Sequence, residues 1–298
     1  MNIHHTNQHF LVRSIFEAAL PPRAVDAHKG SNGSIAIIGG DNGMVGAVLL
    51  CSRAALMTGA GRIYAAILSD EAPVVDLLHP EIMMHSACSL TQLSQLNCVV
   101  IGPGLGTSSR ALELLEFCLV QNVSLLLDAD ALNLIAVHSH LSDLVKHRSA
   151  ETIITPHPGE AARLLAISAS DIQKNRKKFA LKLAKSLHVT CVLKGAGSIC
   201  AHHDGSWFIN TTGNPGLASG GTGDVLSGII GSLVAQGLNT LEAAKLGVYA
   251  HGAAADSLVE RNIGPVGLTA SEVAEEVRHI INTLNKAKPP RLKLSYQD

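Results

Sequence analysis

The chain has 298 residues, of which 47% are hydrophobic and 16% are charged, so it can bury a large core and is not globally disordered. Its formal net charge is −1, and only 3% of its residues are aromatic. This charge and this shortage of stacking side chains argue against nucleic acid or an anionic membrane surface as a partner.

The N-terminus and the cysteines indicate the compartment. The first residues, MNIHHTNQHFLVR, contain no apolar segment typical of a secretory signal, and no uncharged apolar run reaches the roughly 18 residues that span a bilayer. The six cysteines form no C-x-x-C pair, and most lie in apolar runs, as buried free thiols do. We therefore expect a cytoplasmic protein.

Short apolar runs alternate with helical patterns through the first two thirds of the chain. The predicted strands are 34–38, 63–68, 97–101, 123–127, 152–155 and 190–193. The predicted helices are 46–58, 108–120, 130–137, 159–167 and 171–187. Near-continuous apolar strands fit a sheet that is buried on both faces. The lysines and arginines of the last helix are interpreted as a solvated face.

The pattern changes after residue 193. The runs 198–203 and 207–210, joined at Asp204-Gly205, predict a hairpin. A glycine-rich loop and helices at 223–236, 240–259 and 269–285 follow. We predict an α/β three-layer sandwich, with a mostly parallel central sheet and helices on both faces. One domain over 1–298 is the simplest organisation, with an N-terminal extension at 1–22 and a loosely held tail at 286–298.

The stretch 213-GNPGLASGGTGDVLSG-228 places one carboxylate, Asp224, just after closely spaced glycines and at the start of a predicted helix. Free amides and the positive dipole at a helix start bind anions, and glycines let the backbone close around a phosphate. Asp224 fits two roles, a general base for phosphoryl transfer or an ordinary helix cap. The chain contains no G-x-x-x-x-G-K-[ST] motif, so a Walker loop is excluded.

Several further motifs occur in a recognisable order. They are 28-HKGSNGSIAIIGGDNGMVGAVLLCSRAALMTGAG-61, 102-GPGLG-106, 128-DADALN-133, 154-ITPHPGEAARLL-165 and 193-LKGAGS-198, followed by the glycine-rich loop. Together they resemble the ADP-dependent NAD(P)H-hydrate dehydratases of the ribokinase-like superfamily, from about residue 23 to about residue 275. TPHPGE followed by GGTGDVL is the most specific part of the resemblance.

The resemblance implies a nucleotide repair reaction. ADP phosphorylates the ring hydroxyl of the S-epimer of hydrated NADH or NADPH, and loss of phosphate then restores the dihydropyridine, with AMP and phosphate as the other products. Asp224 matches the catalytic base, and Gly220, Gly221 and Gly223 match the anion hole. Phosphoryl transfer to a neutral hydroxyl normally needs a divalent ion, so Mg²⁺ is expected, held mainly through phosphates. Glu160 is a second-rank candidate for contact with the metal or phosphate.

The resemblance also assigns binding residues. The nucleotide-binding positions are Lys194, Gly195, Ala196, Gly197, Ser198 and Gly223. The substrate-binding positions are Ala47, Gly104, Gly106, His157 and Asp224. From the residues alone, Lys194 is interpreted first as an exposed turn lysine, and His157 is equally well a turn histidine without a ligand. Asp130 is interpreted first as a helix N-cap, with a role in ordering Mg²⁺ through water as the alternative.

Three alternatives remain at this stage. A ribokinase-like kinase for a vitamin alcohol would use the same Asp224. An NAD-dependent oxidoreductase is suggested by the strand and glycines at 34–46, although the spacing there is G-x-x-G-x-x-G rather than G-x-G-x-x-G. A nucleotide sensor without catalysis would bind the nucleotide but would not convert a substrate. We also expect a homo-oligomer, dimer or tetramer, and epimerisation of the substrate by a separate protein.

Overall fold

The computed structural model describes residues 9–17, 19–20, 23–24, 26–87, 89 and 95–285. The predicted tail at 286–298 lies outside the described residues, as does part of the predicted N-terminal extension. Within that extension, β1 (Phe10–Leu11) adds a short strand to the sheet and η1 (Arg13–Phe16) follows it.

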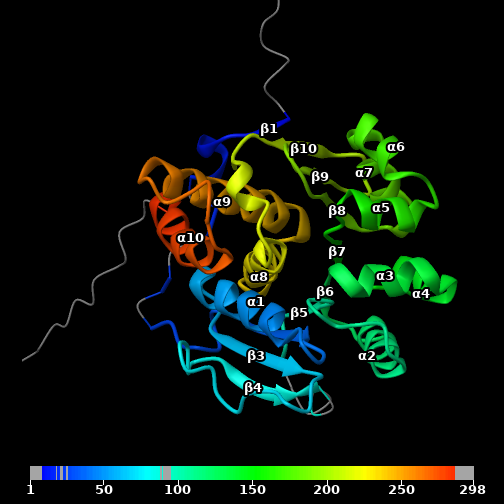
Figure 1. Ribbon diagram of the computed structural model, residues 1–298, viewed down its shortest axis with the longest axis horizontal. Coiled ribbons are helices and arrows are strands. Elements are labelled where there is room, and N and C mark those ends of the chain that lie inside the picture. The colour runs from blue at the N-terminus through cyan, green and yellow to red at the C-terminus, as the bar shows by residue number, and fades with distance from the viewer. Residues whose placement is uncertain are drawn as a thin grey trace, which may run out of the picture.

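A single ten-stranded sheet runs through the molecule in the order β1-β10-β9-β8-β7-β6-β5-β2-β3-β4 (Figure 1). The other strands are β2 (Ser34–Gly39), β3 (Arg62–Ile67), β4 (Met83–Ser86), β5 (Cys98–Ile101), β6 (Ser124–Leu127), β7 (Thr152–Ile154), β8 (Thr190–Leu193), β9 (Ile199–Ala201) and β10 (Trp207–Asn210). All pairs from β4 to β8 are parallel, and β9 is antiparallel to both of its neighbours. The mostly parallel sheet predicted from the sequence is confirmed.

Helices cover both faces of the sheet. One layer contains α1 (Val45–Thr58), α8 (Thr222–Ala235), α9 (Thr240–Glu260) and α10 (Ala270–Leu284). The other contains α2 (Ser109–Leu119), α3 (Ala129–Val137), α4 (Ser139–Lys146), α5 (Pro158–Leu165), α6 (Ala169–Lys174) and α7 (Arg176–Leu187). Strand β2 shows the reason for two layers, because Ile35 and Ile37 enter one apolar core while Ala36 and Ile38 enter the other.

One predicted helix needs correction, and some elements were not predicted. The single helix expected at 171–187 is two helices, α6 and α7, which separate at Asn175 (φ −140°, ψ 50°). Helix α4 was not predicted, because its eight residues contribute only Leu141 and Val145 to the core. Strand β4 was missed because the sequence Met83–Ser86 lacks β-branched residues and lies at the sheet edge. Among the described helices, none combines the length and the apolar character that a bilayer crossing requires.

The strand order determines where a ligand can enter. From β2 the chain builds outward through β3 and β4, then returns to the other side of β2 and builds through β5 to β8. Helix α1 after β2 and helix α2 after β5 therefore lie in different layers. Loops that leave neighbouring parallel strands towards opposite faces open a crevice at the carboxyl edge of the sheet, which is where open α/β sheets bind ligands.

Candidate functional site

The loops after β2 and β5 join at this crevice. The amide of Asp41 donates to the carbonyl oxygen of Gly104 at 2.7 Å. The amide of Gly40 donates to the carbonyl oxygen of Pro103 at 3.0 Å. Gly104 has φ +56°, and a Cβ added to it would lie 2.7 Å from the Cβ of Met44 and 3.3 Å from that of Ala47. Ala47 and Gly104, both predicted to bind substrate, are therefore in contact distance of each other.

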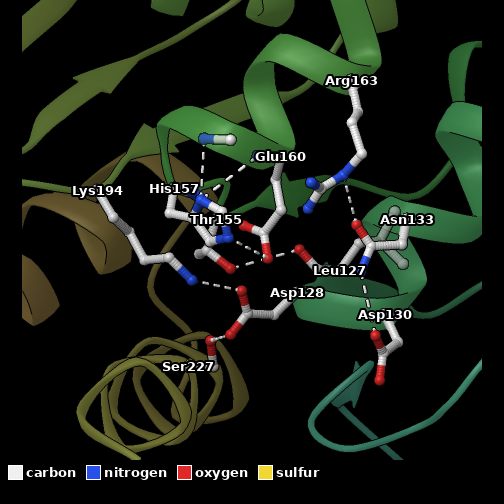
Figure 2. Close-up of polar contacts among 11 residues, drawn as sticks. Leu127, Asp128, Asp130, Asn133, Thr155, His157, Glu160, Arg163, Lys194 and Ser227 are labelled. Atoms are coloured by element: carbon white, nitrogen blue, oxygen red, sulfur yellow. Dashed lines mark hydrogen bonds and ion pairs between the residues drawn. The ribbon is translucent and has the colours of Figure 1, made fainter. Parts of the chain in front are cut away.

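Gly106 is connected to the next helices by a line of polar side chains. Its amide donates to Asp130 Oδ2 at 2.9 Å, and Asn133 Nδ2 donates to Asp130 Oδ1 at 3.1 Å. Arg163 Nε then donates to Asn133 Oδ1 at 3.0 Å, as Figure 2 shows. Asp130 is thus not the N-cap that the sequence suggested, since α3 begins after Asp128 and Asp130 lies in its first turn. Its carboxylate instead holds the loop of Gly106.

Asp128 and Lys194 form a buried ion pair at the centre of the carboxyl edge. Asp128 follows β6 and is 1% exposed, and Lys194 Nζ lies 2.7 Å from its Oδ1. Ser227 of α8 donates to the other carboxylate oxygen at 2.7 Å, so Asp128 lies between the lysine and this helix (Figure 2). The interpretation of Lys194 as an exposed turn lysine is wrong, because only 18% of its side chain is accessible.

The charge of Lys194 is shared with further carboxylates. Burial alone would lower the pKa of Lys194, but Asp128, Glu160 and Asp224 together outweigh burial and raise this pKa. The lysine therefore stays protonated at neutral pH. Its ammonium group also borders the glycine loop, because a Cβ added to Gly223 would lie 3.5 Å from Nζ.

Helix α8 begins without a side-chain cap. Its N-cap is Gly221 at φ +87°, and no side chain accepts a hydrogen bond from the first turn. In the described part of the chain, the first amides of α8 thus lack a side-chain acceptor and are available to an anion. The capping role considered for Asp224 is wrong, because Asp224 is the third residue of the helix and not its N-cap.

Asp224 has the properties of a base matched to neutral pH. Burial raises the pKa of Asp224 to about 7, with a further contribution from Asp128, while Lys194 opposes the rise. A carboxylate with this pKa is about half ionised at pH 7 and accepts a proton more readily than an ordinary aspartate.

Helix α5 presents a contrasting start. His157 Nδ1 accepts from the amide of Gly159 at 2.9 Å, and Glu160 Oε2 accepts from the amide of His157 at 2.7 Å, which together form a capping box. Burial, together with Lys194 and Arg163, lowers the pKa of His157, so the ring is neutral and its proton is on Nε2. Only this nitrogen is left for a ligand, and it lies 3.4 Å from Glu160 Oε1.

Glu160 is the second carboxyl group of the site with a shifted pKa. It is 5% exposed, and burial raises its pKa to about 7, against the opposing charge of Lys194. Three carboxylates, those of Asp128, Glu160 and Asp224, thus face a single ammonium group. The described residues contain no group of three or more His, Cys, Asp or Glu side chains arranged to hold a metal ion. A cation here would need ligands from a bound phosphate as well.

A cavity of about 570 Å³ opens beside Lys194 and Gly223. The predicted nucleotide segment, Lys194 to Ser198, forms one wall, and residues 210–215 and His251 of α9 form others. All six residues predicted to bind nucleotide line this cavity. None of the predicted substrate positions lines it; Ala47, Gly104 and Gly106 lie in and after the loops that follow β2 and β5, His157 lies at the start of α5, and Asp224 lies in the first turn of α8.

Arg176 is a residue that the sequence interpretation missed. It was counted among the solvated basic residues of 171–187, yet its guanidinium donates to the carbonyl oxygens of Leu193 and Ala196. A Cβ on Gly195 would lie 3.0 Å from Arg176 Nη1. Arg176 therefore fixes the loop that forms one wall of the cavity. Nothing in the local sequence distinguishes it from neighbouring Lys174, Lys177 and Lys178.

Comparison with known proteins identifies the family. The model of the NAD(P)H-hydrate dehydratase family matches residues 35–279. The chain belongs to this family. It is 39% identical over 275 residues to the ADP-dependent (S)-NAD(P)H-hydrate dehydratase of Neisseria meningitidis, covering 91% of this chain and 93% of the relative. It is 42% identical over 267 residues to the bifunctional NAD(P)H-hydrate repair enzyme of Coxiella burnetii. This match covers 88% of this chain but only 53% of the Coxiella enzyme.

The fold comparison agrees. The ADP/ATP-dependent NAD(P)H-hydrate dehydratase of Bacillus subtilis, co-crystallised with ATP and Mg²⁺, superposes with a TM-score of 0.83 at 28% identity, over 94% of this chain and 100% of that one. The hydroxyethylthiazole kinase of Pyrococcus horikoshii shares the fold at 16% identity, with a TM-score of 0.58. The ribokinase-like architecture predicted from the sequence is thereby confirmed.

Proposed function

We propose that this protein is an ADP-dependent (S)-NAD(P)H-hydrate dehydratase, which repairs hydrated NADH and NADPH. The observation that carries the proposal is the start of α8, where amides without a side-chain cap and Lys194 border the cavity, and where Asp224, in the first turn, has a pKa raised to about 7. Family membership and the name of the Neisseria relative support it.

In this proposal the cavity holds the adenine nucleotide and the crevice holds the hydrate. The amides ahead of and within the first turn of α8, at Gly220, Gly221 and Gly223, bind the transferring phosphoryl group. Ala47, Gly104, Gly106 and the Nε2 of His157 face the nicotinamide substrate. In the proposed complex, Asp224 of the first turn of α8 contacts both reactants.

Asp224 takes the proton from the ring hydroxyl as that oxygen attacks the β-phosphorus of ADP. The bond between this phosphorus and the bridging oxygen breaks, and AMP leaves. Phosphate then departs from the ring carbon, assisted by the lone pair of the ring nitrogen, and loss of a neighbouring proton completes the double bond. The overall products are NAD(P)H, AMP, phosphate and one proton. Lys194 balances part of the phosphate charge throughout.

The donor set fits a magnesium ion that is carried mainly by the nucleotide. Glu160 would hold it, because this carboxylate is buried near Lys194 with its charge incompletely balanced, and Mg²⁺ is commonly bound by one or two carboxylates plus phosphate oxygens and waters. Bound Mg²⁺ supplies neutralisation of charge on the phosphates. The homo-oligomer and the separate epimerase stay predictions.

The test is incubation of the protein with hydrated NADH and ADP. We expect the absorbance of the reduced nicotinamide to recover, with one AMP and one phosphate formed per molecule restored. A protein that leaves the hydrate unchanged, or that consumes nucleotide and accumulates a stable phosphoester, would contradict the proposal; the second result would indicate a kinase.

A further inference from the structure

One wall of the cavity contains a buried polar atom with nothing to bind. His251 lies in the middle of α9 and is 8% exposed. Its ring lines the cavity together with Lys194, Thr222 and Gly223, and its Nε2 has no hydrogen-bond partner. Buried polar atoms in folded proteins nearly always have a partner, so this nitrogen needs an explanation.

The protonation state of the His251 ring indicates whether its Nε2 needs a hydrogen-bond donor or an acceptor as partner. Burial lowers the pKa of His251 to about 4, and the charge of Lys194 acts in the same direction, so the ring is neutral at pH 7. A hydrogen bond with the backbone of Thr222 opposes this fall in pKa, as a bond does when the ring donates to a carbonyl oxygen. Because Nε2 is the unpartnered atom, Nδ1 is the donor, and Nε2 carries a lone pair.

Several polar groups next to His251 are satisfied from within the protein. Asp256, which is five residues further along α9, accepts from the amide of Gly213 at 2.8 Å and from Asn214 Nδ2 at 3.0 Å. The hydroxyl of Thr212 donates to the Tyr249 carbonyl oxygen at 3.0 Å. The loop beside His251 is therefore fixed in place, and Nε2 is left as a buried polar atom without a partner.

Given the proposed use of ADP, we propose that His251 is a nucleotide-binding residue whose Nε2 accepts a hydrogen bond from the co-substrate. A neutral imidazole nitrogen selects an N–H or O–H donor and rejects a carbonyl or phosphate oxygen. An adenine nucleotide offers two donors of this kind, the exocyclic amino group of the base and the ribose hydroxyls. The ring also connects the nucleotide to the phosphate site, because Thr222, which it binds, is the first residue of α8.

The experiment measures nucleotide binding without the nicotinamide substrate, by calorimetric titration. We compare the parent protein, His251→Leu and His251→Gln with ADP, 2′-deoxy-ADP, 3′-deoxy-ADP and inosine diphosphate, which has an oxygen in place of the amino group. We expect His251→Leu to bind ADP about tenfold more weakly, as the loss of one hydrogen bond to a buried nitrogen predicts. His251→Gln, whose side-chain oxygen can replace the acceptor, should recover part of the loss.

The analogue arms identify the donor. One analogue should bind the parent protein more weakly than ADP does, and it should bind the parent and His251→Leu equally, because the contact is absent from both. His203→Leu removes an imidazole that does not line the cavity and should leave every affinity unchanged. Thermal denaturation verifies that each variant is folded, and His251→Ala, which also lacks an acceptor, serves if the leucine variant is not.

The inference fails if the folded His251→Leu variant binds all four nucleotides as the parent does, or if the parent binds none of them. The proposed function fails separately, if the parent binds ADP but does not restore hydrated NADH. The two failures are therefore distinguishable in the same set of proteins.

Discussion

Helices α5 and α8 both begin at the carboxyl edge of the sheet and both face Lys194. They differ in whether side chains accept hydrogen bonds from the amides of the first turn. At α5 the side chains of His157 and Glu160 satisfy the amides through a capping box. At α8 a glycine stands at the N-cap, and no side chain takes part. The first helix start is complete within the protein, whereas the amides of the second lack a side-chain acceptor and are available to an anion. The difference is the basis for proposing α8, and not α5, as the helix start that binds phosphate.

The largest effect should come from the acid at the uncapped helix. We expect Asp224→Asn to lower turnover by about 10²–10⁴-fold, the range for loss of a general base, while ADP still binds. Recovery of reduced-nicotinamide absorbance measures the rate. Glu242→Gln is the matched control, since Glu242 lies in the first turn of α9 and does not line the cavity. An Asp224→Asn variant with parental turnover would favour a binding protein without catalysis.

The next effect concerns the ion pair between the two helix starts. Lys194→Met leaves the Asp128 carboxylate buried without its cation, and we expect the free energy of unfolding to fall by about 3–5 kcal/mol. Loss of the ammonium group also removes a charge that lowers the pKa of Asp224, so the acid limb of turnover against pH should move to higher pH.

Asp128→Asn provides the opposite arm of this test. It removes a charge that raises the pKa of Asp224, so the acid limb should move to lower pH. Chemical denaturation and pH profiles at saturating ADP measure the two quantities. If the acid limb of the pH profile moved in the same direction for Lys194→Met and Asp128→Asn, Asp224 would not be the titrating group.

The three glycines of the predicted anion hole should separate folding from binding. A Cβ on Gly221 would overlap Leu50, and its φ of +87° is unfavourable for alanine, so Gly221→Ala should destabilise the fold by about 1–3 kcal/mol. Gly220→Ala meets no protein atom within 4 Å, and Gly223→Ala meets only Lys194 Nζ. We expect these two to keep their melting temperature but to bind ADP more weakly; unchanged affinity in both would place the phosphates elsewhere.

Arg176 supports the cavity from outside and should have a smaller effect. Arg176→Met frees the loop of Gly195 and Ala196, and we expect ADP to bind about tenfold more weakly because the loop must be ordered on binding. Lys178→Met, which changes the charge equally on the same helix, is the control. Equal affinities for the two variants would contradict a positioning role for Arg176.

The smallest effect concerns the capping boxes. Glu160→Ala and Glu272→Ala each remove one, at α5 and α10, and each should cost about 1 kcal/mol near neutral pH, as other losses of a cap do. Their pH dependence should differ in sign. Burial raises the pKa of Glu160 to about 7, so its ionisation costs stability as pH rises towards 7, and the cost of Glu160→Ala should shrink over that range.

Hydrogen bonds from Thr269 lower the pKa of Glu272, so its contribution is present at neutral pH. This contribution is lost as pH falls through the lowered pKa, and the cost of Glu272→Ala should therefore shrink at acid pH. Denaturation of both variants across pH 4–8 measures this. Parallel curves would show that Glu160 is no more buried in solution than Glu272.

The sequence by itself determined the parallel sheet, its two helical layers and the segments that follow the strands, because apolar runs and glycine turns are local signals. It placed Asp224 at a helix start and the KGAGS segment after a strand for the same reason. It did not determine the pairing of Asp128 with Lys194, the clamp from Arg176 or the unpartnered nitrogen of His251. Asp128 and Lys194 are 66 positions apart along the chain, and Arg176 binds carbonyl groups that are 17 and 20 positions away. His251 comes 29 positions after Thr222. Only the packed structure brings them together and removes them from water, and this burial is the main cause of the lowered pKa of His251.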